Sequence, residues 1–151
     1  MFDTQVDTLY VWVAVGAVSV AVFGIVTQLP TAQPPDGAAA ATTIDEVATS
    51  PPGSVESREL DAEEWSLSRR QLGLRSDSAT VRQTLLEPVV PATTDSLAAV
   101  LDGEDPEAVF DSTEAFRNAT DRTGGTDWRP APETMTVRHV RWGGVDVTLV
   151  G

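Results

Sequence analysis

Two kinds of hydrophobic pattern divide the chain. Leu9 to Leu29 is apolar or small throughout, with no charge and with Ser19, Thr27 and Gln28 as its only polar positions. From residue 36 onward, apolar residues recur instead at the spacings of amphipathic helices and half-buried strands. The first pattern predicts a membrane span, and the second predicts a folded domain.

The apolar run predicts a transmembrane helix over residues 9–29, preceded by a short tail over residues 1–8. A helix of this length spans about 31 Å, close to the hydrocarbon thickness of a bilayer. A cleaved secretory signal is the alternative, but such signals have a basic start and a shorter apolar region. Residues 1–8 contain two aspartates and no basic residue. We therefore expect an anchor that is retained in the lipid bilayer.

Small residues recur along one side of this predicted helix. Ala14, Ala17, Ala21 and Gly24 are three, four and three positions apart, which places them on one helix face. Helices associate in hydrocarbon through close backbone packing, which small residues permit. The stripe is a candidate docking seam for another membrane helix, from a second copy or from an assembly subunit. The alternative is that Ala and Gly are simply common in membrane helices of GC-rich organisms.

A proline-rich segment separates the predicted span from the rest of the chain. Residues 30–35 read PTAQPP, which predicts a stiff, extended linker. Residues 36–151 are enough for one ordinary hydrophobic core and not for two. Asp36 is a suitable N-cap for a first helix, which Pro51, Pro52 and Gly53 would end. Its predicted apolar face consists of Ala40, Ala41, Ile44, Val47 and Ala48.

The remaining patterns predict strands, then helices, then a hairpin. In residues 55–91, apolar and polar positions alternate around Trp65, Leu67, Leu72 and Leu74, with a turn at SDSA. Prolines at 88 and 91 indicate an edge strand or bulge.

Helices are expected after caps at Thr94 or Asp95, at Asp105 and at Asp111. Two alternating strands flank Gly143-Gly144, a typical hairpin turn, with Val145, Val147 and Leu149 on one face. This order predicts a small α+β domain with helices on one side of an antiparallel sheet.

The composition is strongly acidic. The chain has 23 Asp and Glu residues against ten basic residues, all arginine, which gives a formal net charge of −13. Dense carboxylates without lysine are typical of salt-loving archaea, whose proteins hold water where salt screens charge repulsion. An acidic protein from an ordinary organism is the alternative. The charge argues against nucleic-acid partners, which require a basic surface, and the absence of cysteine excludes disulfides and thiolate metal sites.

The sequence contains few residues that are candidates for catalysis, ligand binding or modification. His139 is the only histidine, and its arginine neighbours make it a poor metal ligand and a poor general base, so we expect a structural role. The serines have no evident activating base, and neither Gly-Gly pair belongs to a phosphate-binding loop. Asn118 begins an N-glycosylation triplet, although it lies in a predicted helix. The sequence therefore predicts no catalytic residue, cofactor or metal.

Four segments carry a resemblance to a known family. They are the first 41 residues, GLRSDSATV, AVFDSTEAFRNA and VRWGGVDVTLVG. They resemble an uncharacterised haloarchaeal family of short single-span membrane proteins, commonly encoded with type IV pilus-like assembly genes. The resemblance implies an accessory component with an external domain. The start of the chain lacks the basic residue and glycine of a prepilin, and the linker prolines would break a pilin helix, so an accessory subunit is favoured over a filament-forming pilin.

Two functional classes follow from the sequence. The first is a non-catalytic, membrane-anchored accessory subunit of an envelope assembly, with other membrane or envelope subunits as its partners. The second is a membrane-anchored extracytoplasmic ligand-binding protein or hydrolase. The missing catalytic set favours the first class. The nearest arginine after the span is Arg58, so only the N-terminal amine and the resemblance place the domain outside the cytoplasm.

Overall fold

The computed structural model describes residues 33–125 and 127–151 of the chain. The predicted tail, the span over residues 9–29 and its small-residue stripe lie outside these ranges and remain predictions. The chain divides into two units, Met1–Ala32 and Gln33–Gly151, and the second unit is the domain described below. No helix within the described ranges is long and apolar enough to cross a membrane.

One four-stranded sheet, here called sheet A, is built around the predicted hairpin. Its strand order is β1 (Val55–Glu59), β7 (Thr134–Trp142), β8 (Val145–Val150) and β5 (Val90–Pro91). The hairpin turns at two glycines with positive φ, 55° at Gly143 and 81° at Gly144, which a glycine adopts without strain. Neighbouring strands are antiparallel except β5 and β8, which run parallel. The predicted hairpin and the predicted edge strand near Pro91 are both confirmed.

The second four-stranded sheet, sheet B, is a meander with one short added strand. Its order is β4 (Thr80–Thr84), β3 (Gln71–Arg75), β2 (Glu64–Ser68) and β6 (Arg129–Pro130), and all neighbours are antiparallel. Its inner face carries the alternating residues that the sequence indicated, and all are at most 2% exposed: Trp65, Leu67, Leu72 and Leu74. Two sheets are present where the sequence analysis expected one. This part of the prediction was wrong.

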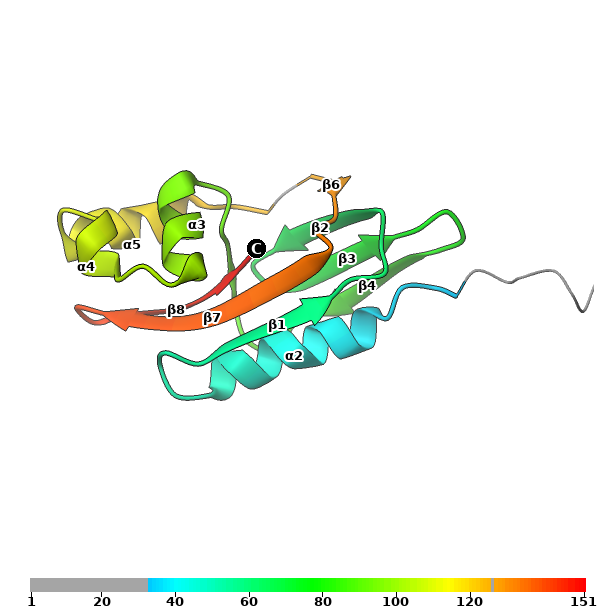
Figure 1. Cartoon of the computed structure of the whole chain (residues 1–151), viewed down its shortest axis with the longest axis horizontal. Helices are drawn as coiled ribbons and strands as arrows, with labels where there is room; N and C mark the ends of the chain where they lie inside the picture. The colour runs from blue at the N-terminus through cyan, green and yellow to red at the C-terminus, as the bar shows by residue number, and fades with distance from the viewer. Residues whose placement is uncertain (1–32, 126) are drawn as a thin grey trace, which may run out of the picture. The chain divides into compact units, whose positions relative to one another are not determined.

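The first helix, α2 (Gly37–Thr49), joins the two sheets by packing against strands of both (Figure 1). As predicted, Asp36 caps it by accepting a hydrogen bond from the Ala39 amide at 3.0 Å. The predicted apolar face is buried from Ala40 to Val47, and Ile44 is fully inaccessible. This face forms the main core with the inner face of sheet B and with Met135, Val137 and Val150 of sheet A.

Three shorter helices form a second core on the opposite face of sheet A. They are α3 (Asp95–Asp102), α4 (Pro106–Val109) and α5 (Thr113–Arg122). Val140, Val145 and Leu149 belong to this core with Leu97 and Phe116, because alternate strand residues point to opposite faces. Figure 1 shows α2 below sheet A and these three helices above it. Helices therefore cover both faces of sheet A, which corrects the prediction that they lie on one side.

Helix caps show where local sequence signals succeed and fail. Thr94 caps α3 by accepting from the Leu97 amide at 3.3 Å, and Gly103 follows the helix, both as predicted. The cap of α5 is Ser112, whose hydroxyl accepts from the Ala115 amide at 3.1 Å, and not the predicted Asp111. The domain is nevertheless a small α+β domain with short helices, as the sequence indicated.

Candidate functional site

His139 is the centre of a hydrogen-bonded network that links α2 to sheet A. It lies on β7 and is 7% exposed. Its Nδ1 atom is 2.6 Å from the Ser50 carbonyl oxygen, just after α2, and its Nε2 atom is 2.5 Å from Oδ1 of Asp146 on β8. Both neighbours are acceptor oxygens, one at the end of α2 and one on the hairpin, so the ring bridges the two elements. The ring is thus fully engaged in holding α2 against the hairpin.

Asp146 receives hydrogen bonds from two side chains. Besides His139, the Nε atom of Arg141 donates to Oδ2 of Asp146 at 2.8 Å. These hydrogen bonds, first from His139 and then from Arg141, hold the pKa of the Asp146 carboxyl below its usual range. The carboxyl remains 41% exposed, so solvent weakens the effect.

Because the pKa of Asp146 is lowered in the folded state, its ionised carboxyl contributes to the free energy of unfolding, and this contribution is lost in acid. The contribution is fully present above the usual carboxyl pKa, near 3.8, and disappears as the pH falls through the lower folded-state pKa. Asp146→Asn should therefore lower the free energy of unfolding by about 1–2 kcal/mol at pH 6. The difference from the parent should shrink below pH 4. Urea unfolding from pH 2.5 to 7 would measure it.

Asp77 provides the control for this variant. It lies exposed in the turn between β3 and β4. Asp77→Asn should change the unfolding free energy by less than about 0.5 kcal/mol at every pH. An Asp146→Asn effect that is absent at pH 6, or that grows as the pH falls, would contradict the role given to the network.

A second feature is a cavity of about 690 Å³ beside β6, here called the arginine cavity. Its walls come from the start of α3, the end of α5 and the loop that leads into β6. Arg122 and Arg129 supply its positive charges, and Asp127 is the acidic residue in its wall. The cavity therefore has the opposite charge from the domain as a whole.

Arg129 is held in place by aromatic packing. Its guanidinium carbon lies 5.0 Å from the centre of the Trp65 ring, a cation–π distance. Its Nε atom is buried and has no hydrogen-bond partner among the described residues. The ion pairs of the described residues involve Arg69, Arg75 and the network at Asp146, and neither Arg122 nor Arg129 takes part.

Trp128, next to Arg129, also lines the cavity and packs on the outer face of sheet B. A Cβ atom on Gly73 of β3 would lie 2.9 Å from Cη2 of Trp128, so a glycine is needed for this close approach. The guanidinium of Arg75 stacks over the same ring at 4.0 Å from its centre. Trp128 is half-buried and is therefore packed against the sheet on one side while it lines the cavity.

The other sequence candidates are dispersed. The predicted docking seam of Ala14, Ala17, Ala21 and Gly24 lies outside the described residues. Asn118 is exposed on α5, within the helix that the sequence predicted. A further arginine pair, which the sequence patterns above do not single out, is Arg69 and Arg70; it forms the turn between β2 and β3, and both side chains donate to backbone carbonyls. Sequence reasoning missed the arginine cavity, because its walls come from segments that no local pattern relates.

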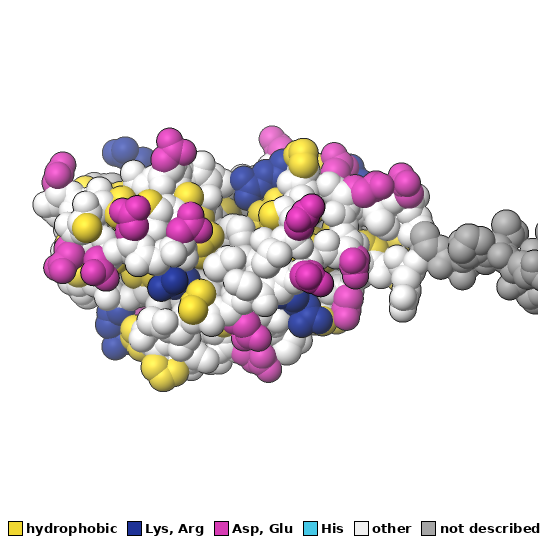
Figure 2. Space-filling view, in the orientation of Figure 1, with side chains coloured by type: hydrophobic (Ala, Val, Ile, Leu, Met, Phe, Trp, Pro, Cys, Tyr) yellow, Lys and Arg dark blue, Asp and Glu magenta, His cyan; other side chains and the backbone are white. Residues whose placement is uncertain are grey.

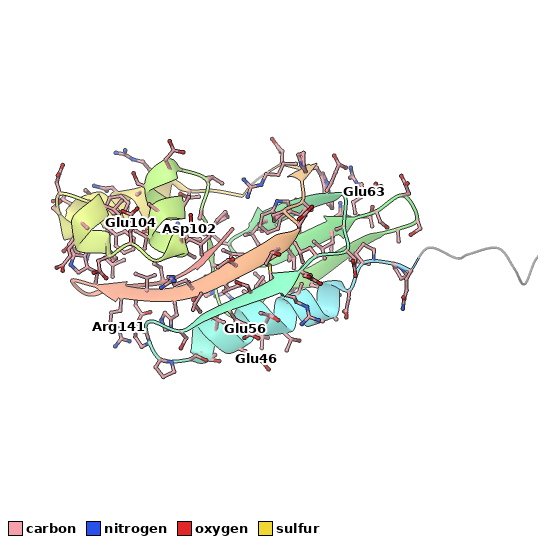
Figure 3. All side chains as sticks on the ribbon, viewed as in Figure 1. Glu46, Glu56, Glu63, Asp102, Glu104 and Arg141 are labelled. Atoms are coloured by element: carbon pink, nitrogen blue, oxygen red, sulfur yellow. The ribbon has the colours of Figure 1, made fainter. Side chains whose placement is uncertain are left out.

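The acidic surface does not converge on one point. Figure 2 shows Asp and Glu side chains scattered over the visible face. The acidic residues labelled in Figure 3 come from α2, β1, the β1–β2 loop and the end of α3: Glu46, Glu56, Glu63, Asp102 and Glu104. Within residues 33–125 and 127–151, no group of three or more His, Asp or Glu residues is arranged to hold a metal ion.

Comparison with known proteins identifies the family. A model of the family of unknown function DUF7283 matches residues 3–140, which is most of the chain. The chain therefore belongs to this family. No curated protein and no solved structure matches the chain. The haloarchaeal origin and the link to assembly genes remain predictions.

Proposed function

We propose that this protein is a non-catalytic, membrane-anchored accessory subunit of an archaeal envelope assembly, and that the assembly is of the type IV pilus-like kind. The observation that carries the proposal is the engagement of His139. Both of its ring nitrogens are held by acceptors, so the one histidine of the chain is occupied in structure. Without it, the serines and threonines of the domain lack the usual general base for nucleophilic catalysis.

The predicted architecture fits a role as a subunit. A span over residues 9–29, joined by the linker over residues 30–35, would tether the domain to the bilayer. The domain itself begins with a capped helix directly after the linker. Such an arrangement presents a folded domain to neighbours in the envelope and leaves the span free to bind other membrane helices.

The small-residue stripe gives this proposal a direct test. Replacing Ala17 and Ala21 by Leu keeps the predicted span hydrophobic but fills the stripe, so insertion should be unchanged. Helix association should weaken by about 1–2 kcal/mol, the scale of such contacts. We expect fewer membrane proteins to copurify with the double variant after crosslinking in native membranes, as identified by mass spectrometry.

The matched control lies on the opposite face of the predicted span. Val15 and Val26 lie on the far side of the predicted helix from the stripe, at about 140° and 160° from its middle for a rotation of about 100° per residue. Replacing both by Leu should leave the set of crosslinked neighbours unchanged. If this control loses its neighbours while the Ala17, Ala21 variant retains them, the seam is on the other face. If the parent protein crosslinks to no membrane or envelope protein, the proposed function is wrong.

One observation favours the alternative function, an anchored extracytoplasmic ligand-binding protein or hydrolase. The arginine cavity has a volume of about 690 Å³, within the range of about 300–1,000 Å³ that is typical of small-ligand sites. It contains charged and aromatic side chains but no histidine. Its residues therefore support the binding of a ligand more readily than hydrolysis.

A further inference from the structure

We infer that the arginine cavity binds a carboxylate group carried on an apolar body. The inference rests on the residues of the cavity wall and does not depend on the proposed function. Four properties support it: the charge of the wall, the unsatisfied donor of Arg129, the further donors at the start of α3, and the apolar surface beside them.

The charge of the wall fits a single negative charge. Arg122 and Arg129 contribute two positive charges and Asp127 contributes one negative charge, which leaves a net charge of +1 (2 − 1). A carboxylate neutralises this charge. A phosphate dianion would instead leave a net charge of −1 in a chain whose formal net charge is already −13. The balance therefore favours a monoanion over a phosphate.

The buried Nε atom of Arg129 is a donor without an acceptor. The Nη groups of Arg129 have no hydrogen bond or ion pair among the described residues either, so the guanidinium that lines the cavity can offer these donors to a ligand. The guanidinium group presents its donors in a planar fork that matches the two oxygens of a carboxylate. Stacking on Trp65 fixes the orientation of this fork before any ligand arrives.

Further donors lie at the start of α3. The Oγ1 atom of Thr94 already accepts from the Leu97 amide, so its own hydroxyl proton is free to be donated. Ser96 adds a second hydroxyl to the wall. The positive end of the α3 dipole has the same preference for an anion, but Asp95 in the first turn offsets part of it, so the two arginines carry most of the attraction.

The rest of the wall is suited to an apolar body. Phe110, Ala119 and Trp128 supply its apolar surface. Most small-ligand sites combine such a surface with a few polar groups that orient the ligand. A carboxylate with an aromatic or aliphatic substituent would use both parts of the cavity. The source could be a free organic acid or the carboxyl end of a polypeptide, which present the same chemistry.

Titration of the full-length protein in detergent would test this inference. With ¹⁵N-labelled arginine, the Nε–H resonance of Arg129 reports on the guanidinium group that lines the cavity. The probes are 3-phenylpropionate, the neutral 3-phenylpropionamide and inorganic phosphate, at constant chloride concentration. The resonance should shift with 3-phenylpropionate at a dissociation constant on the order of 1 mM, as expected for a ligand of this size. An acetylated dipeptide that ends in phenylalanine distinguishes a polypeptide source if it binds more tightly than the free acid.

Substitutions then assign the binding to the two arginines. Arg129→Gln should weaken binding of 3-phenylpropionate by at least about tenfold. Because this variant lacks the Arg129 resonance, its binding is measured from the resonance of Arg122. Arg122→Gln, which changes an exposed side chain, should weaken it about threefold to tenfold. Arg117→Gln is the matched control, because Arg117 is exposed on α5 but does not line the cavity, and its effect should be below about twofold.

Several results would overturn the inference. Equal binding of the amide and the acid would show that only apolar contact matters. Tighter binding of phosphate would assign a different class of anion. An equal loss in Arg117→Gln would indicate general charge attraction and not a site. Failure of all three probes to shift the Arg129 resonance would show that the cavity does not bind anions, whatever the outcome of the crosslinking experiment.

Discussion

Replacing Phe116 by Ala is expected to lower the free energy of unfolding by about 3–5 kcal/mol, the largest effect of a single substitution that we predict. Phe116 is fully inaccessible to solvent and lies at the centre of the second core. Its ring centre is 5.3 Å from that of Phe110 and 5.9 Å from that of Trp142. It thereby joins α5 to sheet A, and its removal would leave a cavity that its neighbours cannot fill. Urea unfolding followed by circular dichroism would measure the change.

An exposed residue gives the comparison. Leu86 is 75% exposed, and Leu86→Ala should change the unfolding free energy by less than about 0.5 kcal/mol. A loss below about 1 kcal/mol for Phe116→Ala would mean that α5 does not depend on this contact for its position. The second core would then be weaker than its burial indicates.

The second large effect concerns the predicted span. We expect the mature protein to keep residues 1–29 and to remain in the membrane fraction after alkaline carbonate washing. A variant without these residues should appear entirely in the soluble fraction, because the domain would then lack the only apolar run long enough to cross a bilayer. Fractionation and immunoblotting would measure both. An N-terminal peptide beginning after Ala32 would instead identify a cleaved signal.

The side of the membrane on which the domain lies can be determined in the same cells. The resemblance and the N-terminal amine predict that residues 36–151 lie outside the cytoplasm, so protease added to intact cells should remove the domain. Digestion only after lysis would reverse the assignment. Gln33 and Pro34 are exposed in the structure, and digestion after lysis shows whether earlier protection came from the membrane and not from the fold.

Local patterns predicted most individual elements. The capped start of α2, the stop at Pro51-Pro52 and the hairpin around Gly143-Gly144 each depend on residues close together in the sequence. The cap of α5 was misplaced by one residue because Asp111 and Ser112 are both good N-caps. Which of the two side chains caps the helix depends on the backbone conformation, and in the structure Ser112 is extended and accepts the bond.

The arrangement of the strands could not be predicted in the same way. Val55 of β1 pairs with Arg138 of β7, and Val90 of β5 pairs with Leu149 of β8. These partners are far apart in the sequence, and strand alternation indicates which face is buried but not which strand lies beside it. The division into two sheets, and the helices on both faces of sheet A, follow from these distant pairings.

The candidate sites show the same limit. The sequence predicted a structural role for His139 from the arginines beside it, and the structure shows both ring nitrogens in hydrogen-bond contact with acceptors. Its partners Ser50 and Asp146 were not visible, since one follows α2 and the other lies across the hairpin. Arg122 and Arg129 are seven positions apart with a glycine pair between them, and only the fold shows that both line one cavity.

The central position of β7 in sheet A also sets an order of events during synthesis. Strands β2, β3 and β4 pair with their immediate neighbours and can form as soon as they leave the ribosome. Strand β1 leaves the ribosome before them, yet its only partner in the sheet is β7, which is translated about 80 residues later. The edge of β1 must therefore stay unpaired until translation of the domain is nearly complete. Its charged residues, Glu56, Arg58 and Glu59, are the kind that discourage pairing with other chains during this interval.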